Sequence, residues 1–181
     1  MNVPPSRNIE LKARIADLSA ARGTAERIAT ARPGHERQRD TYFACARGRL
    51  KLRKIEGRPA QLIAYERADH PDAKASDYRL LELADEDTSV KLRELLEAAL
   101  GITVIVEKTR EVFLHHNVRI HLDEVVGLGS FLEFEAVVAG AVDDAAAHTQ
   151  VAWLQNEFGI AAADLMNNSY SDMLCRKNRP S

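Results

Sequence analysis

The feature that most constrains this chain is a strict alternation of apolar and charged residues in several separate segments. The clearest case runs from Arg7 to Ile15, where every second residue is apolar. The residues between the apolar ones are Asn8, Glu10, Lys12 and Arg14. Successive side chains of a β-strand point to opposite faces, so this pattern predicts a strand with one apolar and one charged face. The same reasoning predicts strands at 38–43, 49–55, 61–67, 77–83, 102–114, 118–125 and 131–138.

Helical spacing of apolar residues separates or follows these strands in three places. One predicted helix begins after Asp17 and ends at Pro33-Gly34, and a second is capped by Asp87 and ends at Gly101. The core side of the second helix is predicted to be Val90, Leu92, Leu95, Leu96 and Ala99. A third, Ala-rich helix covers 144–158.

Eight strands and three helices without a regular βαβ alternation indicate an α+β fold with antiparallel pairing. A barrel is the most economical closure, because it removes exposed sheet edges. We therefore expect an eight-stranded antiparallel, tunnel-like β-barrel with helices packed outside. The 181 residues, of which 45% are hydrophobic, suit a single domain spanning 1–181.

Composition restricts the partners of the chain. The net charge of -2 argues against broad affinity for duplex nucleic acid or for an acidic membrane. Cys45 and Cys175 have neither the number nor the spacing of a disulfide framework or a zinc module. The N-terminus lacks the apolar run of a signal peptide, and no stretch approaches the roughly 20 apolar residues of a membrane span. We expect a cytoplasmic protein with no membrane partner.

The charged faces of the predicted strands indicate an enclosed ligand. Each face alone could be the solvated side of an amphipathic sheet. Together, however, they segregate, with Arg and Lys on some strands and carboxylates on others. Like charges are costly to gather in an enclosed space unless an anion compensates them, and Arg and Lys suit a polyphosphate. Carboxylates beside them suit Mg²⁺ or Mn²⁺ bound next to phosphate oxygens. The pattern predicts phosphoryl or nucleotidyl chemistry.

Ordered motifs on successive strands resemble a known family. The segment Asn8-Ile9-Glu10-Leu11-Lys12 resembles the ExExK strand of the CYTH superfamily, the triphosphate tunnel metalloenzymes, which include class IV adenylyl cyclases and thiamine triphosphatases. Segments 106–110, 118–123, 127–135 and 169–174 are similar to later motifs of the class IV cyclase branch, in the same order. The resemblance covers about 7–174 of the chain.

The resemblance implies roles for particular residues. Glu10 and Glu133 would bind Mg²⁺ or Mn²⁺, with Glu135 supporting the same site. The triphosphate would be held by Lys12, Arg53, Arg67, Lys108, Arg110 and Arg119. Lys12 and Asp123 are the candidate catalytic residues, and Asp123 either binds metal or orients the attacking oxygen. Asn8 replaces the first Glu of the motif, so metal affinity or metal number is expected to differ. A homodimer is compatible with the resemblance.

Two reactions share the predicted geometry. If a ribose 3′-hydroxyl attacks the α-phosphorus of ATP, the products are cyclic AMP and pyrophosphate. If water attacks the terminal phosphorus, the protein is a triphosphatase acting on inorganic tripolyphosphate or on an organic triphosphate. The cyclase resemblance puts ATP first. A non-catalytic polyanion-binding module is the third hypothesis; Asn8 supports it, and four carboxylates facing the ligand oppose it.

Smaller signals carry two interpretations each. His115-His116 is expected to be a solvent-exposed turn rather than a metal site, because no third ligand lies nearby in the sequence. His121 shares the face of the charged residues, where a phosphate contact and a structural hydrogen bond are both open. Tyr65 and Trp153 are expected to pack in the core rather than to stack on a base.

Overall fold

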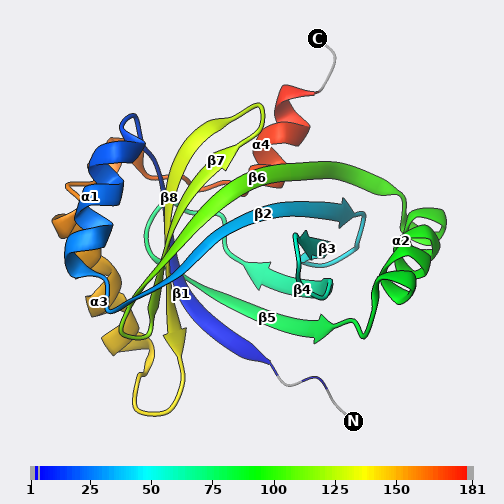
Figure 1. The fold of residues 1–181 in the computed structure, drawn as a ribbon, viewed down its shortest axis with the longest axis horizontal. Helices are drawn as coiled ribbons and strands as arrows, with labels where there is room; N and C mark the ends of the chain where they lie inside the picture. Colours follow the sequence, from blue (N-terminus) through cyan, green and yellow to red (C-terminus); the bar gives the residue numbers. More distant parts are fainter. Residues whose placement is uncertain (1–2, 4, 179–181) are drawn as a thin grey trace.

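The alternating segments form the strands of a closed barrel (Figure 1). The computed structural model describes residue 3 and residues 5–178, and within these the barrel has eight antiparallel strands. The strands are β1 (Ser6–Arg14), β2 (Ala31–Phe43), β3 (Arg49–Ile55), β4 (Gln61–Arg67), β5 (Lys74–Glu82), β6 (Ile102–His115), β7 (Val118–Val125) and β8 (Gly129–Val138). The predicted α+β barrel is confirmed.

Two antiparallel meanders build the barrel. One runs from β2 to β5 and the other from β6 to β8. The meanders join where β2 pairs with β6, and β1 closes the barrel by pairing with both β5 and β8. Segments far apart in the sequence therefore share one interior.

The helices lie outside the barrel. They are α1 (Leu18–Ile28), α2 (Glu86–Leu100), α3 (Asp144–Glu157) and α4 (Tyr170–Lys177), with a short 3₁₀ turn η1 (Ala162–Asp164). Helices α1 and α3 lie together on one side of the barrel, and α2 lies at the opposite side (Figure 1). Helix α3 packs against β8 and β1, whereas α4 packs against β6. Within the described residues, no helix combines the length and apolar character needed to cross a membrane.

The main hydrophobic core lies between the barrel wall and these helices, not in the barrel lumen. Ile9 and Leu11 of β1 and Phe134 of β8 are buried in one cluster with Val151 and Leu154 of α3. On β1, β7 and β8 the apolar face therefore points outward to α1 and α3. Since neighbouring side chains alternate, the charged face points into the lumen. The alternating pattern thus places apolar side chains that pack against the helices on the outer side of the wall and charged side chains on the inner side.

The predicted end of the first helix was wrong. Helix α1 begins after Asp17 as predicted, and the carboxylate of Asp17 accepts a hydrogen bond from the Ala20 N–H at 2.9 Å, but the helix ends at Ile28. Strand β2 starts at Ala31 and runs through Pro33 to the predicted strand, with a register shift against β6 between Ala31 and Gly34. Gly34 adopts a φ of 113°, which suits a bulge. The long partner strand β6 extends β2 beyond its own sequence pattern.

Two further boundaries differ from the predictions. Helix α2 is capped by Asp85, which accepts from the Thr88 N–H at 2.7 Å, and not by Asp87. Leu92 and Leu96 pack against the barrel as expected. The other predicted core positions of this helix are exposed: Val90, Leu95 and Ala99. Strand β5 begins at Lys74, before the start of the predicted strand 77–83. The short C-terminal segment forms α4, whose N-terminus carries a capping box between Ser169 and Asp172.

Candidate functional site

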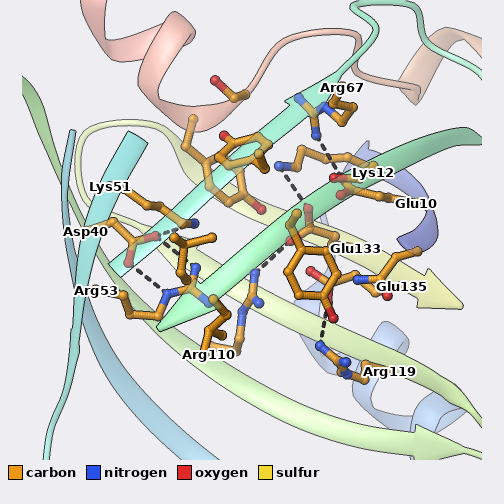
Figure 2. Close-up of a pocket in the computed structure, with 18 of the residues that line it drawn as sticks. Glu10, Lys12, Asp40, Lys51, Arg53, Arg67, Arg110, Arg119, Glu133 and Glu135 are labelled. Carbon is orange, nitrogen blue, oxygen red and sulfur yellow. Dashed lines mark hydrogen bonds and ion pairs between the residues drawn. The ribbon is translucent and has the colours of Figure 1, made fainter. Parts of the chain in front are cut away.

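The lumen of the barrel brings most of the predicted site residues together (Figure 2). Nine of the predicted site residues line the cavity: Glu10, Lys12, Arg53, Arg67, Lys108, Arg110, Arg119, Glu133 and Glu135. They come from six strands and point inward because each occupies the charged parity of its strand. Asp123 is not part of this lining, but it is fully buried and hydrogen-bonded to two residues that are, Lys108 and Arg110.

Cations and carboxylates alternate along one part of the wall. Lys12 Nζ lies 3.1 Å from Glu133 Oε1, and Arg110 Nη2 donates to Glu133 Oε2 at 2.7 Å. Arg67 Nη1 donates to Glu10 Oε2 at 2.9 Å. All of these side chains are largely buried, which strengthens their mutual attraction relative to a surface pair. Figure 2 shows the pairs following the wall of the cavity.

Asp123 binds the cations that line the cavity. Its Oδ1 accepts from Arg110 Nε at 2.6 Å, while Oδ2 accepts from Arg110 Nη2 at 2.6 Å and from Lys108 Nζ at 3.1 Å. The Tyr170 hydroxyl of α4 donates to the same Oδ2 at 2.9 Å. Burial alone would raise the pKa of Asp123, but Arg110 and Lys108 hold it below its ordinary value. The carboxylate is ionised and its oxygens are engaged by protein donors.

A second ionic cluster was not predicted in full. Asp40 of β2 accepts from Lys51 Nζ at 2.9 Å and from Arg53 Nε and Nη2 at 2.8 and 2.9 Å. Burial would raise the pKa of Asp40, yet Arg53 and Lys51 hold it well below its usual range. Asp40 was missed because a single carboxylate in a short predicted strand carried no spacing signal; only its pairing with β3 reveals its partners.

The lumen holds more cationic than anionic side chains, and the pKa values of several buried lysines in the barrel are lowered, mainly by burial. Burial, followed by the neighbouring Arg110, lowers the pKa of Lys108 to about 7. Burial likewise lowers the pKa of Lys12. Lys74, a buried residue that the sequence did not single out, lies 3.5 Å from the carbonyl oxygens of Met166 and Asn167, and burial lowers its pKa to about 8. An anionic ligand would relieve this excess of positive charge.

Several buried polar atoms of the lumen have no hydrogen-bond partner among the described residues. They include Nε and Nη2 of Arg67 and Oδ1 of Asn8. Arg67 uses only Nη1, in its bond to Glu10. A buried polar group without a partner is costly, so these atoms are suited to hydrogen bonds with a polar ligand.

A candidate divalent-metal site lies on the β7–β8 side of the lumen. Ligand atoms of His121, Glu133 and Glu135 all lie within 4.8 Å of one another. His121 Nδ1 is buried without a hydrogen-bond partner in the described chain, 3.7 Å from Glu135 Oε1 and 3.9 Å from Glu133 Oε2. Burial, followed by Arg110, lowers the pKa of His121 and favours the neutral imidazole that binds metals. This donor group fits Mn²⁺ or a related ion.

The predicted metal residue Glu10 is placed differently. It lies directly opposite Glu135 in the β1–β8 register but is bonded to Arg67 rather than grouped with His121. His121 lies on the same face of its strand as Arg119 and Asp123, and the sequence shows this. A shared face alone, however, did not distinguish a metal ligand from a residue that makes a structural hydrogen bond. Arg119 lines the cavity, and its Nη1 donates to Glu135 Oε2 at 3.1 Å.

The predictions for several ring side chains have different outcomes. Tyr65 packs against a core cluster as predicted, and it also lines the lumen beside Tyr42. Trp153, predicted to pack in the core, is 42% exposed on α3. The His115 ring stacks on Trp153 with centroids 4.9 Å apart, and its Nδ1 lies 2.9 Å from the Ile28 carbonyl. His115 is therefore half-buried rather than solvent-exposed, while His116 is exposed as predicted.

The fold and the lumen define the class of antiparallel β-barrels with a charged tunnel. The chain belongs to the CYTH domain family, whose model matches residues 6–170. The family resemblance inferred from the motifs is thereby confirmed.

Solved structures share this fold. The chain is similar to the PH1012 protein of Pyrococcus horikoshii OT3, with 20% identity and a TM-score of 0.77 over 91% of this chain and 98% of that one. It is also similar to a candidate adenylate cyclase of Vibrio parahaemolyticus, with 20% identity and a TM-score of 0.75 over 92% and 97% of the two chains. HpAC1 of Hippeastrum, described with a dominant triphosphatase activity, is 13% identical with a TM-score of 0.63 over 97% of each chain. No curated protein matches the chain significantly.

Proposed function

We propose that the chain is a divalent-metal-dependent enzyme that acts on a triphosphate bound in the barrel lumen, with cyclisation of ATP to cyclic AMP and pyrophosphate as the first candidate reaction. The observation that carries the proposal is the buried array of Arg and Lys side chains, in which two Arg67 donors have no partner among the described residues, next to a group of carboxylates and an imidazole. A pure anion binder would gain nothing from carboxylates facing its ligand.

The cationic residues would bind the phosphate chain. Arg67 has two buried donors free for phosphate oxygens, in addition to the one that Glu10 occupies. Lys12 and Arg53 reach the lumen from strands on different parts of the wall, so a bound chain of phosphates would be contacted from several directions. Such positioning and neutralisation of developing charge account for most of the catalysis in phosphoryl transfer.

Asp123 would act through other residues rather than on the substrate. Its oxygens hold Arg110 and Lys108 by hydrogen bonds, and Tyr170 adds a third donor. A guanidinium fixed in this way keeps its remaining donors aimed at the lumen without losing side-chain entropy on binding. We therefore assign Asp123 as a positioning residue, in place of the two roles expected from the sequence.

Glu133, Glu135 and His121 would hold the divalent ion, and Glu10 lies opposite Glu135 in the β1–β8 pair. When bound, such an ion supplies positive charge to phosphate oxygens as the reaction proceeds. Asn8 contributes an unpartnered amide oxygen where the family motif has a carboxylate, so this site carries one negative charge fewer.

Hydrolysis of the triphosphate is the second candidate reaction. It uses the same grip on the phosphates and differs in the attacking oxygen, which would come from water. The observation that favours this second candidate is the structural similarity to HpAC1, which is described with a dominant triphosphatase activity.

A product assay tests the proposal. Purified protein with Mg²⁺ or Mn²⁺ is offered ATP and inorganic tripolyphosphate separately, and cyclic AMP, pyrophosphate and orthophosphate are resolved by chromatography. Cyclic AMP with pyrophosphate is the expected result, and orthophosphate release would instead identify a triphosphatase. A Glu133→Gln protein purified in parallel controls for contaminating phosphatases. Binding of triphosphate with no product from either compound would contradict the enzymatic proposal.

A further inference from the structure

One part of the lumen wall is apolar and aromatic rather than charged. It is formed by β4 and β5, which pair so that Tyr65 lies opposite Tyr78 and Ile63 lies opposite Leu80. All four side chains line the cavity. Directly paired residues on one face of a sheet lie in contact, so these four form a continuous two-by-two surface, called here the apolar wall.

The apolar wall belongs only in part to the hydrophobic core. Tyr65 packs against one core cluster, but Ile63, Tyr78 and Leu80 belong to none of the three clusters formed by the described residues. Leu80 is 38% exposed although it faces the cavity. A phosphate chain gains nothing from such a surface, because an anion beside apolar groups loses hydration without gaining a partner. The apolar wall therefore suits a part of the ligand that is not phosphate.

The apolar wall adjoins the cationic residues of the proposed phosphate site. Arg67 follows Tyr65 by two positions on the same face of β4, and Lys51 lies opposite Ile63 across the β3–β4 pair. Lys51 Nζ is 5.6 Å from the centroid of the Tyr65 ring. A ligand with an anionic chain at one end and a flat apolar group at the other would contact both surfaces at once.

We propose that the apolar wall binds the organic part of an organic triphosphate, a planar aromatic group such as a nucleobase lying against Tyr78 and Leu80. The inference rests on the proposed function, since it assumes that the neighbouring cations bind phosphates. It excludes inorganic tripolyphosphate as the ligand that uses the whole cavity. Pockets for small molecules commonly combine apolar walls with a few placed polar groups in this way.

Two substitutions of the apolar wall test this, with a matched control on the same strand. Leu80→Ser and Tyr78→Ala each remove apolar surface from the cavity, whereas Leu81→Ser changes the next residue, which is 48% exposed and points to the opposite face. Apparent affinities for ATP and for tripolyphosphate, with Mg²⁺ present, are obtained from the rise in melting temperature over a series of ligand concentrations.

We expect Leu80→Ser and Tyr78→Ala to weaken ATP binding at least about fivefold, the effect of losing base stacking. Tripolyphosphate binding should stay within about twofold of the parent, and Leu81→Ser should change neither ligand. Leu80 is partly exposed, so its variant folds even where Tyr78→Ala does not. Equal changes for the two ligands, or no change for ATP, would overturn the inference while leaving the proposed function standing. A parent protein that binds neither ligand would instead refute the proposed function, and the inference with it.

Discussion

Lys12 and Glu133 are direct partners across the β1–β8 pair, and Lys12 Nζ lies 3.1 Å from Glu133 Oε1. Both side chains are almost completely buried. A residue assigned to phosphate and a residue assigned to metal thus neutralise each other when no ligand is present. When a triphosphate and a divalent ion bind together, Lys12 would pair with a phosphate and Glu133 with the ion, so neither charge would be left without a partner.

Glu133→Gln is expected to abolish metal-dependent turnover. The amide keeps the shape of the side chain but removes the charge that would hold the ion. The variant should lose no more than about 3–5 kcal/mol of stability, the usual cost of breaking a buried ion pair, because the main hydrophobic core lies outside the wall. Mn²⁺ titration followed by electron paramagnetic resonance measures metal binding, and the product assay measures turnover. Glu124→Gln, on the exposed face of β7, is the control; unchanged Mn²⁺ binding in Glu133→Gln would refute the metal assignment.

Arg53→Ala is expected to weaken triphosphate binding about tenfold or more, since a hydrogen bond between charged groups contributes about 1.5–3 kcal/mol. Asp40 would keep only Lys51 as a partner and would repel the ligand. Arg39→Ala, which removes an exposed arginine of β2 paired with Glu107, is the control. Calorimetric titration with tripolyphosphate gives the affinities, and equal affinity in the Arg53 variant would show that Arg53 does not contact the ligand.

Triphosphate affinity should fall as the pH rises through about 7 toward 9. The pKa of Lys108 is about 7 in the free protein, so its ammonium is lost over this interval, whereas a bound anion favours the protonated form. Lys108→Arg keeps a positive charge throughout and should flatten this part of the profile. Tripolyphosphate binding measured from pH 6 to 9 in both proteins tests the assignment; parallel profiles would refute it.

The same lysine affects stability with the opposite dependence on pH. Between about pH 7 and the ordinary lysine pKa, the unfolded chain holds a proton at Lys108 that the folded protein has released. Unfolding therefore takes up a proton, so this group's contribution to the free energy of unfolding rises with pH across that interval. Denaturant melts at pH 7 and pH 9 should show a larger gain for the parent than for Lys108→Met, and equal gains would contradict the lowered pKa.

Asp123→Asn should reduce turnover without changing Mn²⁺ affinity more than about twofold. The substitution weakens the hydrogen bonds that hold Arg110 and Lys108, but it leaves Glu133, Glu135 and His121 in place. Tyr170→Phe, which removes one donor to the same carboxylate, should give a smaller effect in the same direction. A large loss of Mn²⁺ binding in Asp123→Asn would make Asp123 a metal ligand instead of a positioning residue.

Parity explains which parts of the site could be predicted from the sequence. Residues at alternate positions of a regular strand share a face, so recognising β1 and β8 was enough to align Glu10 with Lys12 and Glu133 with Glu135. Parity does not say which face is enclosed. That choice depends on α1 and α3 covering the apolar face, which follows from packing between segments far apart in the sequence.

The residues that the sequence analysis missed owe their positions to pairing between strands, which no single segment reveals. Lys74 lies outside the predicted strand 77–83, because the residues before that strand show no alternation, but pairing with β1 includes it in β5, where Lys74 lies opposite Glu10. The apolar wall arises from the register between β4 and β5, and neither strand alone distinguishes it from core packing. The apolar residues of α2 suggested a buried side, yet the barrel contacts only part of that helix, so Leu95 stays 69% exposed.

The separation of the main core from the lumen has a consequence for how such a barrel changes over time. Substitutions on the inner parity alter charge and ligand chemistry, while the outer parity continues to hold the strands against α1 and α3. A lineage can therefore exchange one anionic substrate for another, or one attacking oxygen for another, while the outer core stays unchanged. The lasting cost of such a change falls on the buried ion pairs of the lumen, which have to be replaced together rather than one partner at a time.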